Sequence, residues 1–312
     1  MTTVGIILSA YNGEKYIEEL IKSIMNSNFA DFKIFVCDDQ SKDSTVEIVK
    51  RLRETYDNRI ELSINEQNLG STHSFLSNLY RVNKNSPCSY YMFCDQDDIW
   101  LKDKISLSLK VMKRLENRRG EFEPLLVFND AIIVDDNLSY IARSFYKTNK
   151  LKVHKTDFSH MLMENKCIGC TVMMNRALVN LLNEEYDDRI RYHDWWMALL
   201  ASSFGHIRYI KTPTLLYRQT GSNQVGQTAF SDYVSERASK KEDIKVRLDK
   251  TYLQAQAFAK QYLTKLNKPK RRHLLSFLKI KSSGFFKKRG IIIKNRFYKS
   301  GLLRNIGLLF YV

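Results

Sequence analysis

The first half of the chain alternates short apolar runs with segments whose apolar residues recur at helical spacing. Between the runs, Ile17, Leu20 and Ile24 fall on one face of a helix, and similar patterns occur at 46–52 and 105–115. Apolar strands that alternate with amphipathic helices are typical of βαβ units, so we expect an α/β fold with a mainly parallel sheet flanked by helices. The predicted strands span residues 4–10, 33–37, 60–64, 90–94 and 125–128.

After residue 128 this regular alternation ends. The pattern predicts continued extended structure at 131–134, a small apolar segment at 167–175, a helix that begins at His193, and a strand at 207–217. From Tyr233 onward, helical patterns dominate. We therefore expect an α/β domain over residues 1–232, made of the halves 1–128 and 129–232, and a helical region over 233–312.

A polar cluster follows each of the first four predicted strands. In a parallel sheet the carboxyl ends of the strands meet at one edge, where ligands bind. Any one cluster is compatible with an ordinary loop and a helix cap, but four on one edge favour a binding crevice. The clusters span residues 9–13, 38–45, 65–71 and 95–98.

The fourth cluster, which we call the acid loop (residues 95–98), holds Asp95, Asp97 and Asp98 within four positions. Carboxylates this close repel one another unless a cation neutralises them. Hard divalent cations take oxygen ligands and often share them with substrate phosphates. The alternative is a solvated acidic turn that caps the next helix.

The composition indicates a folded protein whose charge is unevenly distributed along the chain. Its 312 residues are 44% apolar and include only 4 prolines, and no run is long enough to span a bilayer or resembles a signal peptide. The five scattered cysteines suit a reducing cytoplasm, and the 167–170 Cys-x-x-Cys pair has no second pair to complete a zinc site. We expect tight packing there rather than redox or metal chemistry.

The net charge of +16 belongs to the end of the chain. Residues 250–312 hold 16 Lys and Arg and no Asp or Glu, whereas the rest holds 34 basic and 34 acidic residues. A nucleic-acid binder would spread its charge over the folded body, so we expect no nucleic-acid partner. Apolar helix faces with basic flanks, near 274–278 and 302–310, favour contact with an anionic membrane; a helical cap with a solvated basic side is the alternative.

Taken in order, the motifs resemble the nucleotide-sugar half of an inverting glycosyltransferase of family 2, which has the GT-A fold. The resemblance covers residues 3–225. Two later motifs narrow it to the rhamnosyltransferase-like branch that builds bacterial surface polysaccharides. The motifs are Ser9-Ala10-Tyr11-Asn12, Asp38-Asp39-x-Ser41-x-Asp43-x-Thr45, Asn68-x-Gly70, Asp95-Gln96-Asp97-Asp98-Ile99-Trp100, His193-Asp194-Trp195-Trp196 and Tyr217-Arg218-Gln219-x-Gly221-x-Asn223.

The resemblance implies a donor site built on these loops. Asp38 and Asp39 would lie by the nucleoside, with one carboxylate accepting the pyrimidine N3–H. Asp97 would bind Mg²⁺ or Mn²⁺, with Asp95 near the ribose or the metal and Asp98 in support, and the metal would take up charge from the leaving diphosphate. The remaining donor-side residues would be Ser9, Ala10, Tyr11, Asn68, Gly70, Gln96, Asn129 and Asp130.

The resemblance also implies that Asp194 is the base. Inverting transfer is a single displacement, so one carboxylate must take the proton of the acceptor hydroxyl. A helix N-terminus stabilises the anionic form that a base requires. The alternative is an ordinary acid in the first turn of a helix.

Several other residues of these motifs have more than one candidate role. His193 would orient Asp194 or bind phosphate, or is structural. One of Trp195 and Trp196 would stack on an acceptor sugar while the other packs inside. Arg218 would pair with the diphosphate, or forms a surface ion pair. Gly169 would lie beside the acceptor cleft and admit backbone or ligand.

These inferences predict a metal-dependent transferase that moves L-rhamnose from dTDP-rhamnose to a lipid-linked or polysaccharide acceptor. We expect it to lie on the cytoplasmic face of the membrane. A UDP-hexose donor (glucose, galactose or an N-acetylated form) is the alternative within the class. A non-catalytic nucleotide-sugar-binding scaffold and a nucleic-acid binder are alternatives from other classes.

Overall fold

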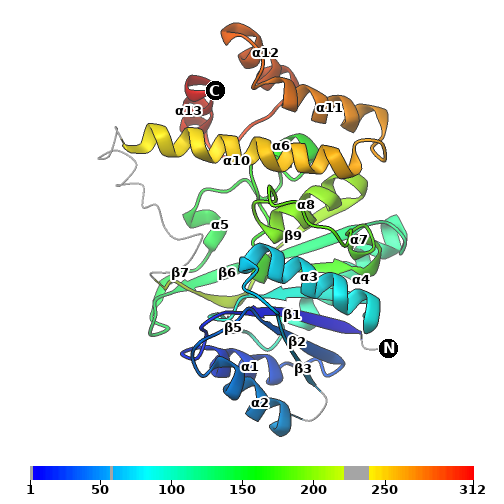
Figure 1. The fold of residues 1–312 in the computed structure, drawn as a ribbon, viewed down its shortest axis with the longest axis vertical. Coiled ribbons are helices and arrows are strands. Elements are labelled where there is room, and N and C mark those ends of the chain that lie inside the picture. The colour runs from blue at the N-terminus through cyan, green and yellow to red at the C-terminus, as the bar shows by residue number, and fades with distance from the viewer. Residues whose placement is uncertain (1–2, 57–58, 221–238) are drawn as a thin grey trace. The chain divides into compact units, whose positions relative to one another are not determined.

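The computed structural model describes residues 3–56, 59–220 and 239–312 (Figure 1). Internal contacts divide the chain into two compact units. Unit 1 comprises Met1–Phe145, Cys167–Tyr186 and Tyr192–Gln219, and unit 2 comprises Tyr146–Lys166, Asp187–Arg191 and Thr220–Val312. The domain boundary expected at residue 232, and Gly221 and Asn223 of the last motif, lie outside the described residues.

The first four long strands of unit 1 form the parallel part of its sheet. β1, β2 and β4 are apolar and largely buried because helices cover both faces, whereas the edge strand β3 is mostly part-exposed. Figure 1 shows α3 on one side of β1, β2 and β3 and α1 and α2 on the other. The strands are β1 (Val4–Ala10), β2 (Phe32–Asp38), β3 (Ile60–Ile64) and β4 (Tyr90–Cys94), paired in parallel in the order β3-β2-β1-β4.

The rest of the sheet is mixed. β8 (Val172–Asn175) is antiparallel to β4 and to β6 (Leu125–Val134), and β6 is parallel to β9 (His206–Arg218). Within the described residues the sheet has nine strands, of which β5 (Ile99–Trp100) and β7 (Tyr140–Ala142) are short. The α/β class is thus confirmed, and the strands predicted at 4–10, 33–37, 60–64, 90–94 and 207–217 match β1, β2, β3, β4 and β9. The strand predicted at 125–128 and the extended segment predicted at 131–134 are parts of one longer strand, β6.

The helices of unit 1 confirm the three patterns found between the early strands and the helix expected at His193. Those patterns leave out α3, because buried polar side chains such as Ser74 and Asn78 interrupt its apolar face. The long helices are α1 (Ile17–Met25), α2 (Thr45–Thr55), α3 (Gly70–Asn85), α4 (Lys104–Arg119) and α8 (His193–Phe204); the short ones are η1 (Gly169–Thr171) and α7 (Arg176–Val179). The short helix α5 (Phe145–Thr148) begins at the last residue of the first stretch of unit 1, and its other residues belong to unit 2.

Unit 2 is helical, as expected for the end of the chain. Its core includes contacts between the rings of Phe158 and Phe258 and of Phe277 and Phe297, with centroids 5.9 and 5.1 Å apart. Among the described residues no helix is both long and apolar enough to cross a bilayer. The helices are α6 (Phe158–Met163), α10 (Ser239–Tyr262), α11 (Lys268–Lys279), α12 (Phe285–Asn295) and α13 (Leu302–Tyr311).

Candidate active site

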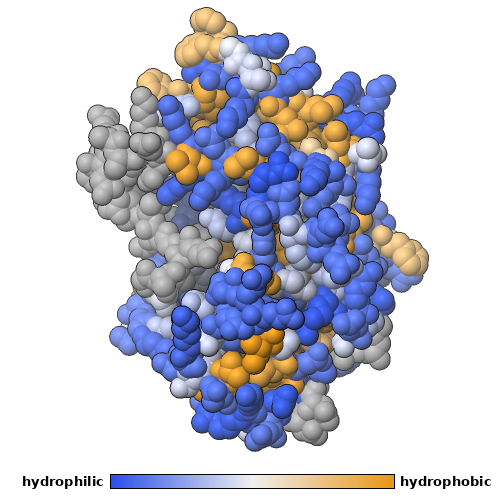
Figure 2. Space-filling view, viewed as in Figure 1, coloured by the Kyte–Doolittle hydropathy of each residue, from blue (hydrophilic) through white to orange (hydrophobic). Residues whose placement is uncertain are grey.

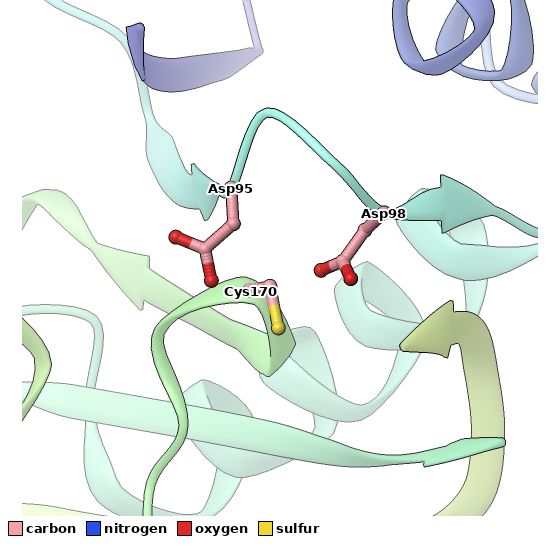
Figure 3. A group of neighbouring side chains, drawn as sticks. All are labelled: Asp95, Asp98 and Cys170. Atoms are coloured by element: carbon pink, nitrogen blue, oxygen red, sulfur yellow. The ribbon is translucent and has the colours of Figure 1, made fainter. Parts of the chain in front are cut away.

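The acid loop begins directly where β4 ends and carries two carboxylates toward the 3₁₀ turn η1. Asp95 and Asp98 lie on either side of the Cys170 thiol, and one ligand atom from each of the three residues lies within 4.8 Å of the others (Figure 3). Asp98 is 1% exposed and Asp95 is partly exposed. The predicted cluster of carboxylates at the strand end is therefore present, with one member buried.

This cluster is short of positive charge. Burial, and then the charges of Asp97 and Asp194, raises the pKa of Asp95 to about 7. Burial also raises the pKa of Asp98 well above its usual range, and the Oδ2 atom of Asp98 has no hydrogen-bond partner among the described residues. The nearby Lys104 ammonium is buried, and burial lowers its pKa to about 8. A bound cation would offset these unfavourable terms.

The donor set fits a hard divalent cation. Carboxylate oxygens are the ligands that Mg²⁺ and Mn²⁺ prefer, and the unpartnered Asp98 oxygen is an orphaned acceptor beside them. Burial holds the pKa of the Cys170 thiol well above its usual value, so the sulfur stays protonated and is a poor ligand. The carboxylates of the acid loop, and not the thiol, would hold the metal.

The loops after β1 and β2 interlock. The backbone N–H of Asn12 donates to the Ser41 hydroxyl, and the side-chain oxygen of Asn12 accepts from the backbone N–H of Lys42, each over 2.9 Å. Gly13 donates its N–H to Thr45 Oγ1 over 2.8 Å. Asn12 adopts a φ of 48°, which asparagine tolerates better than most residues. The two predicted polar clusters therefore form one surface at the sheet edge.

Asp39 anchors the third polar cluster to this surface. Its buried carboxylate accepts from the Asn65 side chain and from the amides of Leu69 and Gly70, over 2.7 to 2.9 Å. Gly70 has a φ of +72°, in the left-handed region that favours glycine. The Asn68 side chain donates to the Asp39 carbonyl oxygen. Asn68 and Gly70 thus lie beside Asp39, in line with the crevice predicted from the sequence.

Gln96 joins the acid loop to the loop after β1. Its carbonyl oxygen accepts from the Tyr11 amide over 2.9 Å, and its NH₂ group donates to the Tyr11 carbonyl oxygen over 3.1 Å. A Cβ at Gly13 would come within 2.6 Å of the same side chain. The amide of Gln96 therefore holds Tyr11 in place. The Tyr11 side chain is 46% exposed, whereas Ala10 is fully buried and Ser9 donates to Ser74.

Arg218, at the end of β9, is hydrogen-bonded to the backbone of the acid loop. Its guanidinium donates to the Asp97 carbonyl oxygen over 2.9 Å and to Glu19 Oε2 over 2.6 Å. It also donates to the Asp136 carbonyl oxygen, and its side chain is 3% exposed. The buried Arg218 side chain therefore pairs with the half-exposed Glu19 and also links the acid loop to the backbone at Asp136. Its expected contact with the diphosphate stays a prediction.

Asp194 lies in the first turn of α8 with both carboxylate oxygens bound. Oδ1 accepts from its neighbour Trp195 N over 2.6 Å, and Oδ2 accepts from Gly169 N over 2.9 Å. A Cβ at Gly169 would lie 2.8 Å from His193 Nε2, so only glycine lets η1 approach α8 this closely. The charge of Asp194 contributes to the raised pKa of Asp95, so the two carboxylates lie close enough to interact electrostatically.

Comparison with known proteins decides the family. A model of Glycosyl transferase family 2 matches residues 5–118. The chain is 31% identical over 231 residues to the dTDP-rhamnosyl transferase RfbG of Shigella flexneri, across 70% of this chain and 73% of the relative. The chain belongs to glycosyltransferase family 2. As a member of that family it is an enzyme that transfers a sugar from a nucleotide-sugar donor.

Other relatives agree with this assignment. The chain is 28% identical over 205 residues to the UDP-Glc:alpha-D-GlcNAc-diphosphoundecaprenol beta-1,3-glucosyltransferase WfgD of Escherichia coli, across 65% of this chain and 72% of that one. Staphylococcus aureus TarS 1–349 in complex with UDP-GlcNAc aligns with a TM-score of 0.54 at 17% identity, over 94% of this chain and 89% of that chain. The mannosyltransferase PcManGT from Pyrobaculum calidifontis, in complex with GDP-Man and Mn²⁺, aligns with a TM-score of 0.52 at 16% identity, over 98% and 78%. These likenesses confirm the GT-A fold.

Within this family 2 site, His193 is enclosed by aromatic rings. It stacks on Phe75 at a centroid distance of 4.0 Å and meets the Phe93 ring edge-on at 4.7 Å. Burial lowers the pKa of His193 to about 3, so the ring is neutral at physiological pH. A neutral, enclosed imidazole is unsuited to phosphate, and these contacts favour the structural role. Trp195 and Trp196 are also buried, at 4% and 1% exposed.

Asn129 and Asp130 lie at a register shift between β6 and β9 and are buried. Asn129 accepts from the Ser108 hydroxyl, and Asp130 accepts from the Tyr209 hydroxyl, each over 2.9 Å. These bonds attach both residues to the interior of the fold, and their expected place near the donor sugar stays a prediction.

Sequence reasoning missed Cys170 and Lys104 as neighbours of the acid loop. The tight packing expected for the Cys-x-x-Cys segment is confirmed, since Cys167 and Cys170 are fully buried. Lys104 lies 4.7 Å over the Trp100 ring, and no hydrogen-bond partner for its ammonium occurs in the described part of the chain. One signal for this buried charge was present in the sequence: Lys104 lies at helical spacing from the buried positions of α4.

Proposed function

We propose that the enzyme transfers L-rhamnose from dTDP-rhamnose to an acceptor hydroxyl, with inversion at the anomeric carbon, during the synthesis of a bacterial surface polysaccharide. The observation that carries the mechanism is the Asp194 carboxylate, fixed by two backbone N–H groups and close enough to the acid loop to influence Asp95. The sugar is supported by the relative named as a dTDP-rhamnosyl transferase.

Asp194 acts as the base in this mechanism. It lies in the first turn of α8, and its oxygens accept hydrogen bonds from the backbone N–H groups of Gly169 and Trp195. Both these bonds and the helix dipole favour the anion. The anion takes the proton of the acceptor hydroxyl as the acceptor oxygen bonds to the anomeric carbon. The bond from that carbon to the diphosphate breaks on the opposite face, which inverts the configuration. The nucleoside diphosphate leaves with the electron pair.

The acid loop receives the diphosphate end of the donor. Asp97 and Asp95 would hold the metal, with Asp98 in support, and bound Mg²⁺ or Mn²⁺ supplies Lewis-acid stabilisation of the charge on the leaving diphosphate. Arg218 acts through the loop backbone, because its guanidinium is committed to the Asp97 carbonyl and Glu19.

The loops after β1, β2 and β3 receive the nucleoside. The half-exposed Tyr11 ring, beside Ser9 and Ala10, offers a surface for the base. The Asp38 carboxylate accepts from the amide and hydroxyl of Ser41, whereas Asp39 accepts from three donors, so Asp38 has more capacity left for a pyrimidine N3–H. Asn68 and Gly70 complete this side of the crevice.

A UDP-hexose donor is the second candidate, favoured by the relative named as a UDP-Glc-dependent glucosyltransferase. The deciding experiment compares dTDP-rhamnose with UDP-glucose, UDP-galactose and UDP-GlcNAc in donor hydrolysis and in transfer to a lipid-linked acceptor. Turnover of dTDP-rhamnose with an inverted product supports the proposal. Turnover of the UDP-sugars alone contradicts the rhamnose assignment, and donor binding without turnover of any donor supports a non-catalytic scaffold.

We further propose that the enzyme works as a peripheral protein on the cytoplasmic face of the membrane. The 16 basic and zero acidic residues from Lys250 to Val312 support attraction to anionic lipids. A lipid-linked oligosaccharide acceptor is consistent with the diphosphoundecaprenol substrate in the name of the Escherichia coli relative. Attachment would hold the enzyme where such an acceptor is found.

A further inference from the structure

Helix α13 carries most of its apolar side chains on the outside. Leu302, Leu303, Ile306 and Phe310 are 55 to 76% exposed, whereas Leu308 is 2% exposed and packs inward. Residues 302, 306 and 310 are four positions apart and therefore lie along one stripe of the helix. An amphipathic helix of a soluble domain normally buries such a stripe. Here the stripe faces away from the core of unit 2.

Helix α12 extends this exposed surface. Phe285, Phe286 and Ile293 are 61%, 84% and 53% exposed, while Ile292 is buried. Arg289 connects the two helices, because its guanidinium stacks 3.5 Å from the centre of the Phe285 ring and donates to the Phe310 carbonyl oxygen over 3.5 Å. Figure 2 shows hydrophobic atoms among hydrophilic ones at the end where Figure 1 labels α12. We call these seven exposed side chains the apolar face; they are Phe285, Phe286, Ile293, Leu302, Leu303, Ile306 and Phe310.

The charges around the apolar face select its occupant. Residues 285–312 include seven Lys and Arg and no Asp or Glu. Lys287, Lys294, Arg296 and Arg304 are exposed on or directly beside the same two helices. A second copy of this surface would bring like charges together, whereas an anionic bilayer offers phosphate groups for the basic side chains and acyl chains for the apolar ones.

The length of the helices fixes the mode of contact. α12 has 11 residues and α13 has 10, about half the length required to span the hydrocarbon core. Short helices with apolar residues on one side and basic residues beside them lie in the plane of the interface. Burying a Phe or Leu side chain in acyl chains favours binding, and each basic residue near the anionic surface adds to it.

We propose that α12 and α13 insert the apolar face into the interface of an anionic bilayer, so that attachment is hydrophobic as well as electrostatic. This inference deepens the membrane attachment proposed above and rests on it for its biological setting. It adds the side chains that enter the bilayer, and it predicts binding that persists when salt screens the charges.

The test measures partition of the full-length protein onto phosphatidylcholine vesicles with and without phosphatidylglycerol, at low and high salt. The variant Phe286→Ser/Leu302→Ser/Phe310→Ser removes three members of the apolar face. Phe122→Ser is the matched control, because Phe122 is 86% exposed and lies in unit 1. We expect the triple variant to bind anionic vesicles at least tenfold more weakly and to lose its high-salt binding, while the control binds like wild type.

A second variant reports insertion directly. Phe286→Trp should show a blue shift of its fluorescence on anionic vesicles and quenching by brominated acyl chains, above the constant signal of the three buried native tryptophans. Binding of the triple variant at wild-type strength, an unshifted signal from the introduced indole, or binding to RNA but not to vesicles overturns the inference. Transfer to a soluble acceptor is measured in parallel and should be unchanged in every variant, so a wrong donor or reaction is distinguished from a wrong docking surface.

Discussion

Gly169 donates its backbone N–H to the Asp194 carboxylate over 2.9 Å, and the missing side chain of this glycine leaves room for the His193 ring. Gly169→Ala should therefore displace η1 from α8 and misalign the base. We expect kcat to fall about tenfold or more, with an unfolding free energy lower by about 1–3 kcal/mol. Steady-state kinetics and thermal melting measure both effects. Gly290→Ala, where an added Cβ meets nothing within 4 Å, is the control and should keep full activity on a soluble acceptor.

Asp194→Asn should remove the base while the turn that carries it persists. The asparagine oxygen still accepts a backbone hydrogen bond, but the neutral amide cannot take a proton. We expect kcat to fall about 10²–10⁴-fold with donor affinity little changed. Calorimetric titration with donor nucleotide, beside the rate assay, separates the two quantities. Near-normal turnover in this variant would remove Asp194 from the mechanism.

Asp97→Asn should weaken the response to metal. Losing one charged ligand lowers affinity for a hard cation, so half-maximal activity should require roughly tenfold more Mn²⁺. Treatment with a chelator should abolish wild-type transfer, and added Mn²⁺ or Mg²⁺ should restore it. Activity that survives exhaustive chelation would contradict a metal at the acid loop.

Arg218→Lys should destabilise the fold, although the charge is kept. A lysine ammonium cannot reach Glu19, the Asp97 carbonyl and the Asp136 carbonyl at once, as the guanidinium does. We expect a loss of about 1–3 kcal/mol in unfolding free energy. Arg51→Lys is the matched control, because Arg51 is exposed and pairs with Glu18, and its effect should stay within about 0.5 kcal/mol. Denaturant unfolding measures both variants.

His193 should make the protein less stable in acid. Its pKa is about 3 in the fold and near 6.5 when unfolded, so between these values the unfolded chain binds the extra proton. Stability should fall as the pH drops through this window, by up to about 1.4 kcal/mol per pH unit. His193→Asn should remove this part of the slope, while the exposed His154→Asn should leave it. A slope that is equal in both variants would contradict the assignment.

The sequence predicted the scaffold better than the use of its polar side chains. Apolar runs located β1 and β4 to the residue, because strands buried on both faces leave little choice of residue type. The pattern was insufficient for α3, where buried Asn78 donates to backbone oxygens inside the fold. A buried polar residue at a helical position looks like a solvent-exposed one until its partner is known.

The same limit applies to the candidate site. Gln96 and Arg218 were both candidates for contact with the substrate, and that contact stays a prediction. What the sequence did not indicate is that the Gln96 side chain bonds to the Tyr11 backbone and that the Arg218 guanidinium donates to the Asp97 carbonyl oxygen. The motif places such residues at the site but does not reveal which atoms they bind. Cys170 was visible only as part of a packed segment, because its nearness to Asp95 depends on how β4 and β8 pair.

The bidentate contact between Gln96 and the Tyr11 backbone joins the segment proposed to meet the nucleobase with the segment proposed to meet the diphosphate. In the proposed donor complex, the loop after β1 and the acid loop would therefore bind the two ends of the nucleotide at a fixed distance from each other. This distance would select the length of the nucleotide and would not depend on the sugar. Engineering a different sugar specificity should therefore begin at η1 and α8 and should leave the contact between Gln96 and Tyr11 unchanged.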